Sequence, residues 1–151
     1  AERGPASLIY TSGIWVIGAT GEPADEGAPV APIELVAWRP AHEQRVLAAD
    51  SPRLRAAVIR PGIVYGGSRG IVADLLASAE NGLMRIVGSG ENHWPLVYDR
   101  DLADLYVRVL TSEEGRGVFH GTDEADEQVR TIADAIGAHR PHAPDIRFVP
   151  L

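Results

Sequence analysis

The sequence has 151 residues, 45% of them hydrophobic and 23% charged, which is the composition of a globular protein large enough to bury a core. All 14 basic residues are arginine, against 21 acidic ones, and the net charge of -7 argues against nonspecific nucleic-acid binding, which needs a basic surface stripe. The absence of cysteine excludes disulfides, thiol catalysis and thiolate metal sites.

Apolar spacing and turn residues predict strands and helices that alternate along the chain. A Pro/Gly-rich loop is expected between Glu22 and Pro32. The predicted strands are Ser7–Thr11, Leu54–Arg60, Met84–Val87 and Gly117–His120. The predicted helices run from Pro40 to about Ala49, from Ile71 to Ala79, from Asp99 through Val109, and from about Val129 to a stop at Gly137. This alternation predicts an α/β fold.

Two segments are the most informative: Tyr10-Thr-Ser-Gly-Ile-Trp-Val-Ile-Gly18 and Val58-Ile-Arg-Pro-Gly-Ile-Val-Tyr-Gly-Gly67. Each is an apolar run that stops in small or ring-closed residues, as a buried parallel strand does at its carboxyl end. In open α/β sheets the ligand lies beyond these strand ends. We therefore expect a ligand site where the two segments end.

The segment Val16-Ile-Gly-Ala-Thr-Gly21 looks like the start of a dinucleotide-binding fingerprint. That fingerprint needs a helix after the glycine turn, so that the helix N-terminus faces the pyrophosphate. Here Pro23 and an acidic, proline-rich stretch follow without apolar periodicity. The sequence therefore argues against a phosphate loop at this position.

The order and spacing of the two segments resemble the second half of an extended short-chain dehydrogenase/reductase, the NAD(P)-binding epimerase/dehydratase family. In this resemblance Val16-Ile-Gly18 matches the Val-Tyr-Gly strand-end motif of the family. It implies the later strands of a doubly wound Rossmann-type parallel sheet plus a small C-terminal substrate lobe. Residues 1–67 are expected in the nucleotide-binding part and residues 68–151 mostly in the lobe, with strands that return to the sheet as an open alternative. It also implies that the glycine-rich unit of the family lies outside this chain.

The resemblance implies a degenerate catalytic set. Family enzymes use a Ser or Thr after the first strand, and a Tyr followed four residues later by a Lys. The matching positions carry Gly13, Leu35 and Arg39. Arginine keeps the positive charge and can bond a ribose hydroxyl, whereas leucine transfers no proton. Thr11, Ser12 and His42 remain as candidate proton donors, since histidine ordinarily exchanges protons near neutral pH.

Further site residues follow from the same resemblance. Arg39, Pro61, Gly62 and Ile63 match positions that face the cofactor, and the candidate substrate contacts are Trp15, Arg60, Trp94 and Tyr98. Trp94 stands where nucleotide-sugar enzymes commonly place an arginine, which favours an apolar or aromatic small molecule. The alternative is that these aromatic residues only pack the lobe. No histidine spacing indicates a metal site.

Three functional hypotheses remain open. The first is an atypical oxidoreductase or epimerase/dehydratase-like enzyme that uses NAD or NADP on a small-molecule substrate. The second is a non-catalytic NAD(P)-binding protein that senses redox state or acts as a scaffold, and the third is an inactive fragment. No signal-peptide pattern or long apolar run is present, so we expect a cytoplasmic protein without a membrane partner. A homo-oligomer and a pairing with a complementing chain both remain open.

Overall fold

The computed structural model describes residues 6–150, which form two compact units. The first unit contains the chain up to Gly62 together with Arg100–Gly121. The second contains Ile63–Asp99 and the chain from Thr122 onward. The chain thus leaves the first unit, returns to it and leaves it again.

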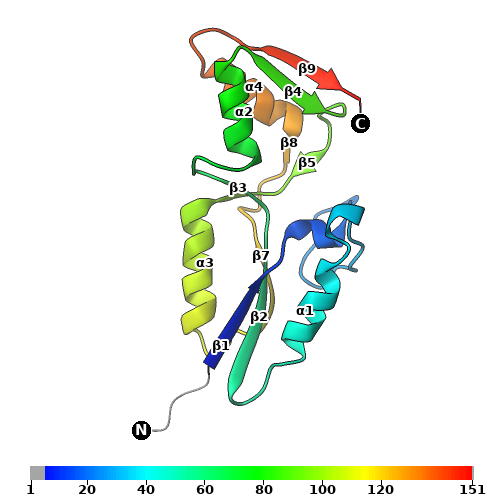
Figure 1. The fold of residues 1–151 in the computed structure, drawn as a ribbon, viewed down its shortest axis with the longest axis vertical. Helices are drawn as coiled ribbons and strands as arrows, with labels where there is room; N and C mark the ends of the chain where they lie inside the picture. The colour runs from blue at the N-terminus through cyan, green and yellow to red at the C-terminus, as the bar shows by residue number, and fades with distance from the viewer. Residues whose placement is uncertain (1–5, 151) are drawn as a thin grey trace. The chain divides into compact units, whose positions relative to one another are not determined.

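The first unit is built on a parallel sheet (Figure 1). Its strands β1 (Ala6–Thr11), β2 (Leu54–Pro61) and β7 (Gly117–Gly121) lie in the order β1-β2-β7. In the register, Tyr10 pairs with Val58 and Val58 with Val118. The central strand reads as a continuous apolar run because both of its faces are covered, and Ala56 through Ile59 are fully buried. The parallel pairing of β1 and β2 confirms the α/β prediction.

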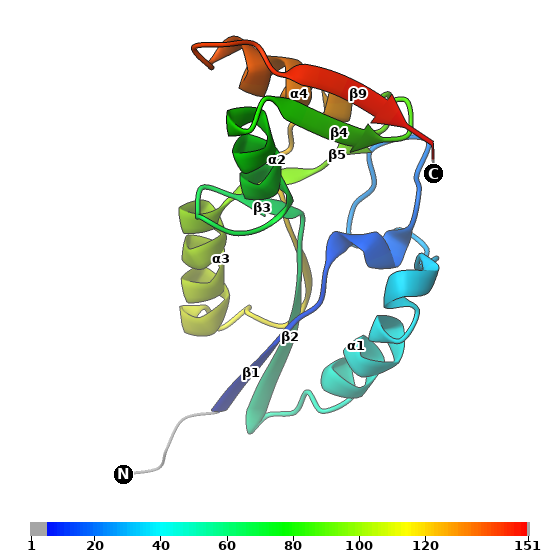
Figure 2. The ribbon, with the colours of Figure 1, turned by 45° about the horizontal axis from the view of Figure 1, so that its top comes forward.

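Helices α1 (Arg39–Leu47) and α3 (Asp99–Thr111) lie on opposite sides of this sheet (Figure 2). The amphipathic α3 places Leu102, Leu105, Tyr106 and Val109 against Ile9, Ala57, Ile59 and Phe119. Helix α1 packs against β1 and β2 from the other side. Pro40 suits the first turn of α1, since a missing N–H costs nothing there.

Strand β1 ends at Thr11, as the sequence predicts, although the apolar sequence continues to Ile17. The run from Tyr10 to Gly18 does not continue as a strand, because Ile14–Ile17 forms a short 3-10 helix, η1. The Val16 N–H donates to the Gly13 carbonyl at 3.2 Å, and the Gly18 N–H donates to the Trp15 carbonyl at 3.2 Å. Ile14, Val16 and Ile17 of η1 bury their side chains against Ala24 and Ala28 of the following loop rather than within the sheet, whereas Trp15 is exposed. A second short 3-10 helix, η2 (Glu34–Val36), precedes α1.

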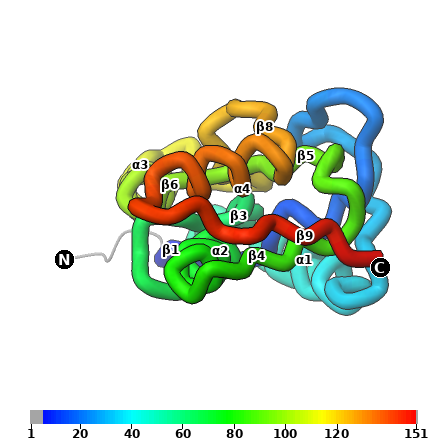
Figure 3. Tube along the Cα trace, turned by 90° about the horizontal axis from the view of Figure 1, so that it is seen from above, coloured from blue at the N-terminus to red at the C-terminus, as the bar shows by residue number. Residues whose placement is uncertain are grey.

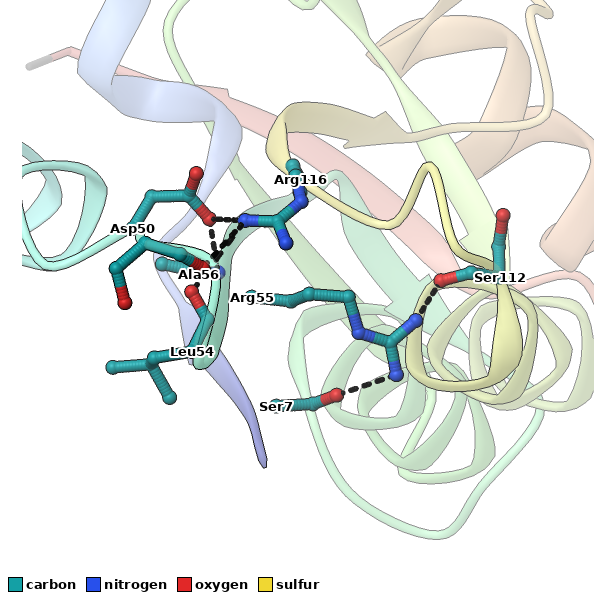
Figure 4. A network of polar contacts seen from close by, with 8 residues as sticks. Ser7, Asp50, Leu54, Arg55, Ala56, Ser112 and Arg116 are labelled. Carbon is teal, nitrogen blue, oxygen red and sulfur yellow. Dashed lines mark hydrogen bonds and ion pairs between the residues drawn. The ribbon is translucent and has the colours of Figure 1, made fainter. Parts of the chain in front are cut away.

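The amino ends of the strands are held by an arginine network (Figure 4). The Arg55 guanidinium donates to the Ser7 hydroxyl at 2.8 Å and also to the Ser112 carbonyl. Arg116 pairs with the Asp50 carboxylate, which also accepts the Ala56 N–H at 2.9 Å. That backbone hydrogen bond lowers the pKa of Asp50 below its ordinary value. The network lies at the end of the sheet away from the predicted ligand edge.

The second unit has three short two-stranded sheets and two helices. Strands β4 (Leu83–Val87) and β9 (Asp145–Val149) pair in parallel and lie side by side in Figure 3. The other pairs are β3 (Ile63–Tyr65) with β6 (Leu96–Tyr98), which is parallel, and β5 (His93–Trp94) with β8 (Glu127–Gln128), which is antiparallel. Helices α2 (Ile71–Glu80) and α4 (Val129–Ala138) pack on a core that contains Leu75, Met84, Ile86, Val129 and Ile132.

The predicted helices are present, with bounds that differ by a few residues. Helix α4 passes through Gly137 and ends at Ala138, so the expected stop at Gly137 is wrong by one residue. In the described chain no helix begins directly after the glycine turn at Gly18–Gly21, since residues 22–33 are irregular. This agrees with the prediction that the turn is not a phosphate loop. Among the described residues no helix has the length and apolar character needed to cross a membrane.

Candidate functional site

The carboxyl ends of β1, β2 and β7 meet at one edge of the first unit's sheet. The Ser12 N–H continues the β1–β2 ladder by donating to the Ile59 carbonyl at 2.7 Å. The Gly62 N–H donates to the Gly121 carbonyl at 2.9 Å, which fixes the turn after Pro61. This edge is where an open α/β sheet places its ligand.

Arg39 reaches this edge from the first turn of α1. Its Nη1 donates a hydrogen bond to the Ser12 carbonyl, and its guanidinium lies 5.3 Å from the centre of the Trp38 ring. Two further polar atoms here, Ser12 Oγ and Arg39 Nε, are buried and have no hydrogen-bond partner among the described residues. Buried polar atoms are normally paired in folded proteins, so Ser12 Oγ and Arg39 Nε are two unsatisfied groups at this edge of the sheet.

His42 lies one turn after Arg39 on the same helix. Its ring is stacked with Tyr10 at a centroid distance of 6.3 Å, and its Nδ1 is 3.0 Å from the Trp38 carbonyl oxygen. A carbonyl only accepts hydrogen bonds, so Nδ1 carries the proton and Nε2 is the nitrogen free to exchange one. The structure therefore brings Arg39 and His42 to the same face of the sheet.

Thr11 points to the other face. Side chains alternate along a strand, so Thr11 and Tyr10 project to opposite sides of the sheet. The Thr11 hydroxyl lies 2.5 Å from the hydroxyl of Tyr106 on α3. The structure thus separates Thr11 from His42.

A buried ion pair anchors α1 to β2. Glu43 and Arg60 are each only 3% exposed. Arg60 Nη2 lies 2.6 Å from Glu43 Oε2, and Arg60 Nε lies 3.1 Å from Oε1. This two-point contact fixes the helix that carries Arg39 relative to the turn at Pro61. Arg60 was considered as a substrate contact in the sequence, and the structure places its guanidinium in this ion pair.

His120, near the carboxyl end of β7, extends the same cluster. Its Nε2 accepts from Arg60 Nη1 at 3.4 Å, and its backbone N–H donates to the Glu26 carboxylate at 2.7 Å. Burial lowers the pKa of His120 below its ordinary value, and the backbone N–H of His120 lowers the pKa of Glu26. Near neutral pH the imidazole is therefore neutral and the carboxylate is ionised. The hydrogen bond to Glu26 thus holds the loop between Glu22 and Pro32 at the edge of the sheet.

The other candidate residues are divided between the two units. Pro61 and Gly62 lie at the edge described above, and Trp15 is partly exposed on η1. Ile63, Trp94 and Tyr98 belong to the second unit, where Trp94 packs against the core and Tyr98 lies 5.5 Å from the Tyr65 ring. Leu35, which the sequence resemblance places at the expected tyrosine position, is 70% exposed. In the chain that the structure describes, no group of three or more His, Asp or Glu side chains is arranged to hold a metal ion.

The sequence prediction missed the roles of Glu43, His120 and Glu26. One signal was available, because an arginine inside the apolar strand Val58-Ile-Arg60 needs a buried acidic partner. Glu43 lies on α1, the helix that precedes this strand, one turn after Arg39. It was therefore the natural candidate for the acidic partner of Arg60. No comparable sequence pattern linked Glu26 to His120.

Comparisons with known proteins agree with this fold. A family model described as "Epimerase: NAD dependent epimerase/dehydratase family" matches residues 1–120. An uncharacterized protein of Schizosaccharomyces pombe is 33% identical over 135 residues, which cover 86% of this chain and 44% of that protein. An epimerase family protein, SDR39U1 of Bos taurus, is 30% identical over 102 residues, which cover 64% of this chain and 32% of that protein.

Solved structures show the same architecture at lower sequence identity. The dTDP-glucose 4,6-dehydratase of Bacillus anthracis, solved in complex with NAD, superimposes with a TM-score of 0.82 at 19% identity. The match covers 96% of this chain and 50% of that structure. The 151 residues thus span half or less of the length of these proteins.

Proposed function

Because this chain belongs to the NAD-dependent epimerase/dehydratase family, we propose that it forms the nicotinamide side of an NAD(P) site. The protein that contains it would be an oxidoreductase or an epimerase/dehydratase-like enzyme acting on a small molecule. The observation that carries this proposal is the Arg39 guanidinium held at the carboxyl ends of β1 and β2. The family's cation is thereby replaced by another cation rather than lost.

The residues at this edge fit a nucleotide cofactor. Arg39 donates through Nη1 to the Ser12 carbonyl, and its guanidinium is a donor group of the kind that suits the acceptor oxygens of a ribose. The turn at Gly62 carries no side chain that would block a ring. Ser12 Oγ and Arg39 Nε are the two atoms at this edge among the four buried side-chain atoms without a partner in the described residues; the others are Arg55 Nε and Glu127 Oε2. When bound, the nicotinamide supplies or accepts the hydride.

Proton transfer requires a group other than the usual tyrosine. Leu35 stands at that position and has no exchangeable proton. We assign this role to His42, whose Nε2 is free while its Nδ1 is held by the Trp38 carbonyl. Ser12 is the second candidate, and Thr11 is the weaker one because its hydroxyl is engaged by Tyr106 on the other face of the sheet.

An apolar residue at the tyrosine position also supports a second candidate function. Leu35 has no exchangeable proton, and the lack of a general acid at this position favours binding without turnover. On this alternative the protein binds NAD(P) and reports redox state or holds a partner, such as a second copy of itself or a complementing chain.

Cofactor titration tests the proposal. We expect the 151-residue chain alone to bind NADH and NADPH weakly or not at all, because no helix N-terminus follows its glycine turn at Gly18–Gly21 to hold the pyrophosphate. The same chain, extended by the coding sequence immediately upstream, should bind one of the two cofactors in calorimetry. Tight binding by the 151 residues alone would contradict this account and make Gly18–Gly21 a phosphate loop. Absence of binding by both chains would overturn the cofactor proposal.

A further inference from the structure

Gly13 lies directly under the guanidinium of Arg39. A Cβ atom built on Gly13 would lie 2.6 Å from Arg39 Nη1 and 3.6 Å from Cζ, and no other atom outside residues 12–14 lies within 4 Å. A distance of 2.6 Å is too short for two non-bonded heavy atoms of this kind. Any side chain at position 13 therefore displaces the guanidinium.

The backbone does not require glycine at this position. Gly13 has φ 174° and ψ 151°, an extended conformation that every residue adopts. The absence of a side chain at position 13 therefore matters for one reason: it leaves room for the Arg39 guanidinium. This sets Gly13 apart from Gly18, whose φ of 68° lies in the left-handed region.

Arg39 cannot easily give way as a whole. The helix that carries it is fixed by the buried Glu43–Arg60 ion pair one turn later, and the guanidinium is held by the Ser12 carbonyl. A side chain at position 13 would therefore swing the end of Arg39 away from Ser12 without moving the helix. The buried Nε of Arg39 would be exposed by the same movement.

We infer that Gly13 is a positioning residue for Arg39. Residue 13 has no side chain, and the Arg39 guanidinium occupies the space next to it. The two residues together therefore set the distance between the cation and the end of β1. This inference rests on the proposed function, because Arg39 is the group that contacts the cofactor. It predicts that a substitution at position 13 changes cofactor affinity only while residue 39 is arginine.

A double-mutant cycle tests the coupling. In the upstream-extended chain, Gly13→Ala should weaken the binding of the preferred cofactor by about tenfold or more, the loss expected when a charge-assisted hydrogen bond is misplaced. In an Arg39→Lys background the same change should alter affinity by less than about twofold, because the shorter ammonium leaves room for a methyl group. Gly21→Ala is the matched control, since a Cβ at Gly21 meets nothing within 4 Å.

A second measurement reports the position of Arg39 without any cofactor. In the 151-residue chain, phenylglyoxal modification followed by peptide mapping gives the reactivity of each arginine, with the exposed Arg45 of α1 as the internal reference. Arg39 should react more slowly than Arg45 in the wild type, and Gly13→Ala should bring the two rates together while Gly21→Ala should not. Because the Gly13 backbone is extended, the thermal midpoint of Gly13→Ala should stay close to that of the control.

The outcomes separate the inference from the proposed function. If the extended wild-type chain binds the cofactor and Gly13→Ala matches Gly21→Ala in both affinity and Arg39 reactivity, the positioning role is overturned and the proposed function stands. If Gly13→Ala weakens binding equally in the arginine and lysine backgrounds, the coupling is also overturned. If the wild type binds neither cofactor, the proposed function fails, and with it the claim that Gly13 positions Arg39 for a ligand.

Discussion

Replacing His42 with alanine should slow hydride transfer by about 10²–10⁴-fold, the usual loss when a general acid is removed. The reason is that Leu35 has no exchangeable proton, and His42 Nε2 is a free imidazole nitrogen on the face that carries Arg39. The rate is measured in the upstream-extended chain, as consumption of NADH or NADPH with a small ketone on which the wild type is active. Cofactor affinity should change little, because His42 is assigned to the proton and not to binding.

The second unit provides a matched control. His139 is also exposed, and its Nδ1 lies 2.8 Å from the carbonyl of Ala135, four residues earlier, as His42 Nδ1 lies near the carbonyl of Trp38. His139→Ala should leave the rate unchanged, as should Thr11→Ala. If His42→Ala has wild-type activity and Ser12→Ala does not, the donor is Ser12. If the wild type binds cofactor but turns over no substrate in the panel, the non-catalytic function replaces the enzymatic one.

Glu43→Gln should lower the free energy of unfolding by about 3–5 kcal/mol, the cost of removing one partner from a buried ion pair. The change leaves the Arg60 guanidinium buried beside a neutral amide, and both positions are only 3% exposed. Urea denaturation followed by circular dichroism measures the loss. The expected effect is a large fraction of the stability of a typical domain.

Two comparisons make this result specific. Glu80→Gln breaks the ion pair with Arg140, where the Glu80 side chain is 64% exposed, and should cost no more than about 1 kcal/mol. The double variant Glu43→Leu/Arg60→Met removes both charges and should be more stable than Glu43→Gln alone. Equal losses for Glu43→Gln and Glu80→Gln would mean that the Glu43–Arg60 contact contributes no more than a surface pair.

The secondary structure that could be predicted is the part with strong local periodicity. Strand β2 was predicted because both faces are buried, and α3 because its apolar residues recur at helical spacing. Four strands were not predicted: β3, β5, β6 and β8. Each is only two or three residues long, which is too short for a periodic apolar pattern to be recognised. Strand β9 was also missed, although its pairing with β4 is regular, since Asp145 and Arg147 interrupt its apolar pattern.

The position of the candidate site stays a prediction, and the structure adds the contacts of its residues. The sequence placed it at the ends of β1 and β2, where the structure has Arg39 at the Ser12 carbonyl. The end of β1 at Thr11 was predicted, whereas the conformation of the apolar segment after it was not, because Ile14–Ile17 forms the 3-10 helix η1. Long-range partners such as Glu26 and His120 depend on a loop whose path has no periodic signal.

The most direct test of the central claim removes the cation at the strand ends. In the upstream-extended chain, Arg39→Ala should weaken the binding of the preferred cofactor by about 10–100-fold, the worth of one charge-assisted hydrogen bond. Arg45→Ala removes an equal charge from the exposed side of the same helix and should leave affinity unchanged. Calorimetric titration of both variants and the wild type measures the difference. Equal affinities for Arg39→Ala and Arg45→Ala would contradict a nicotinamide site at this edge of the sheet.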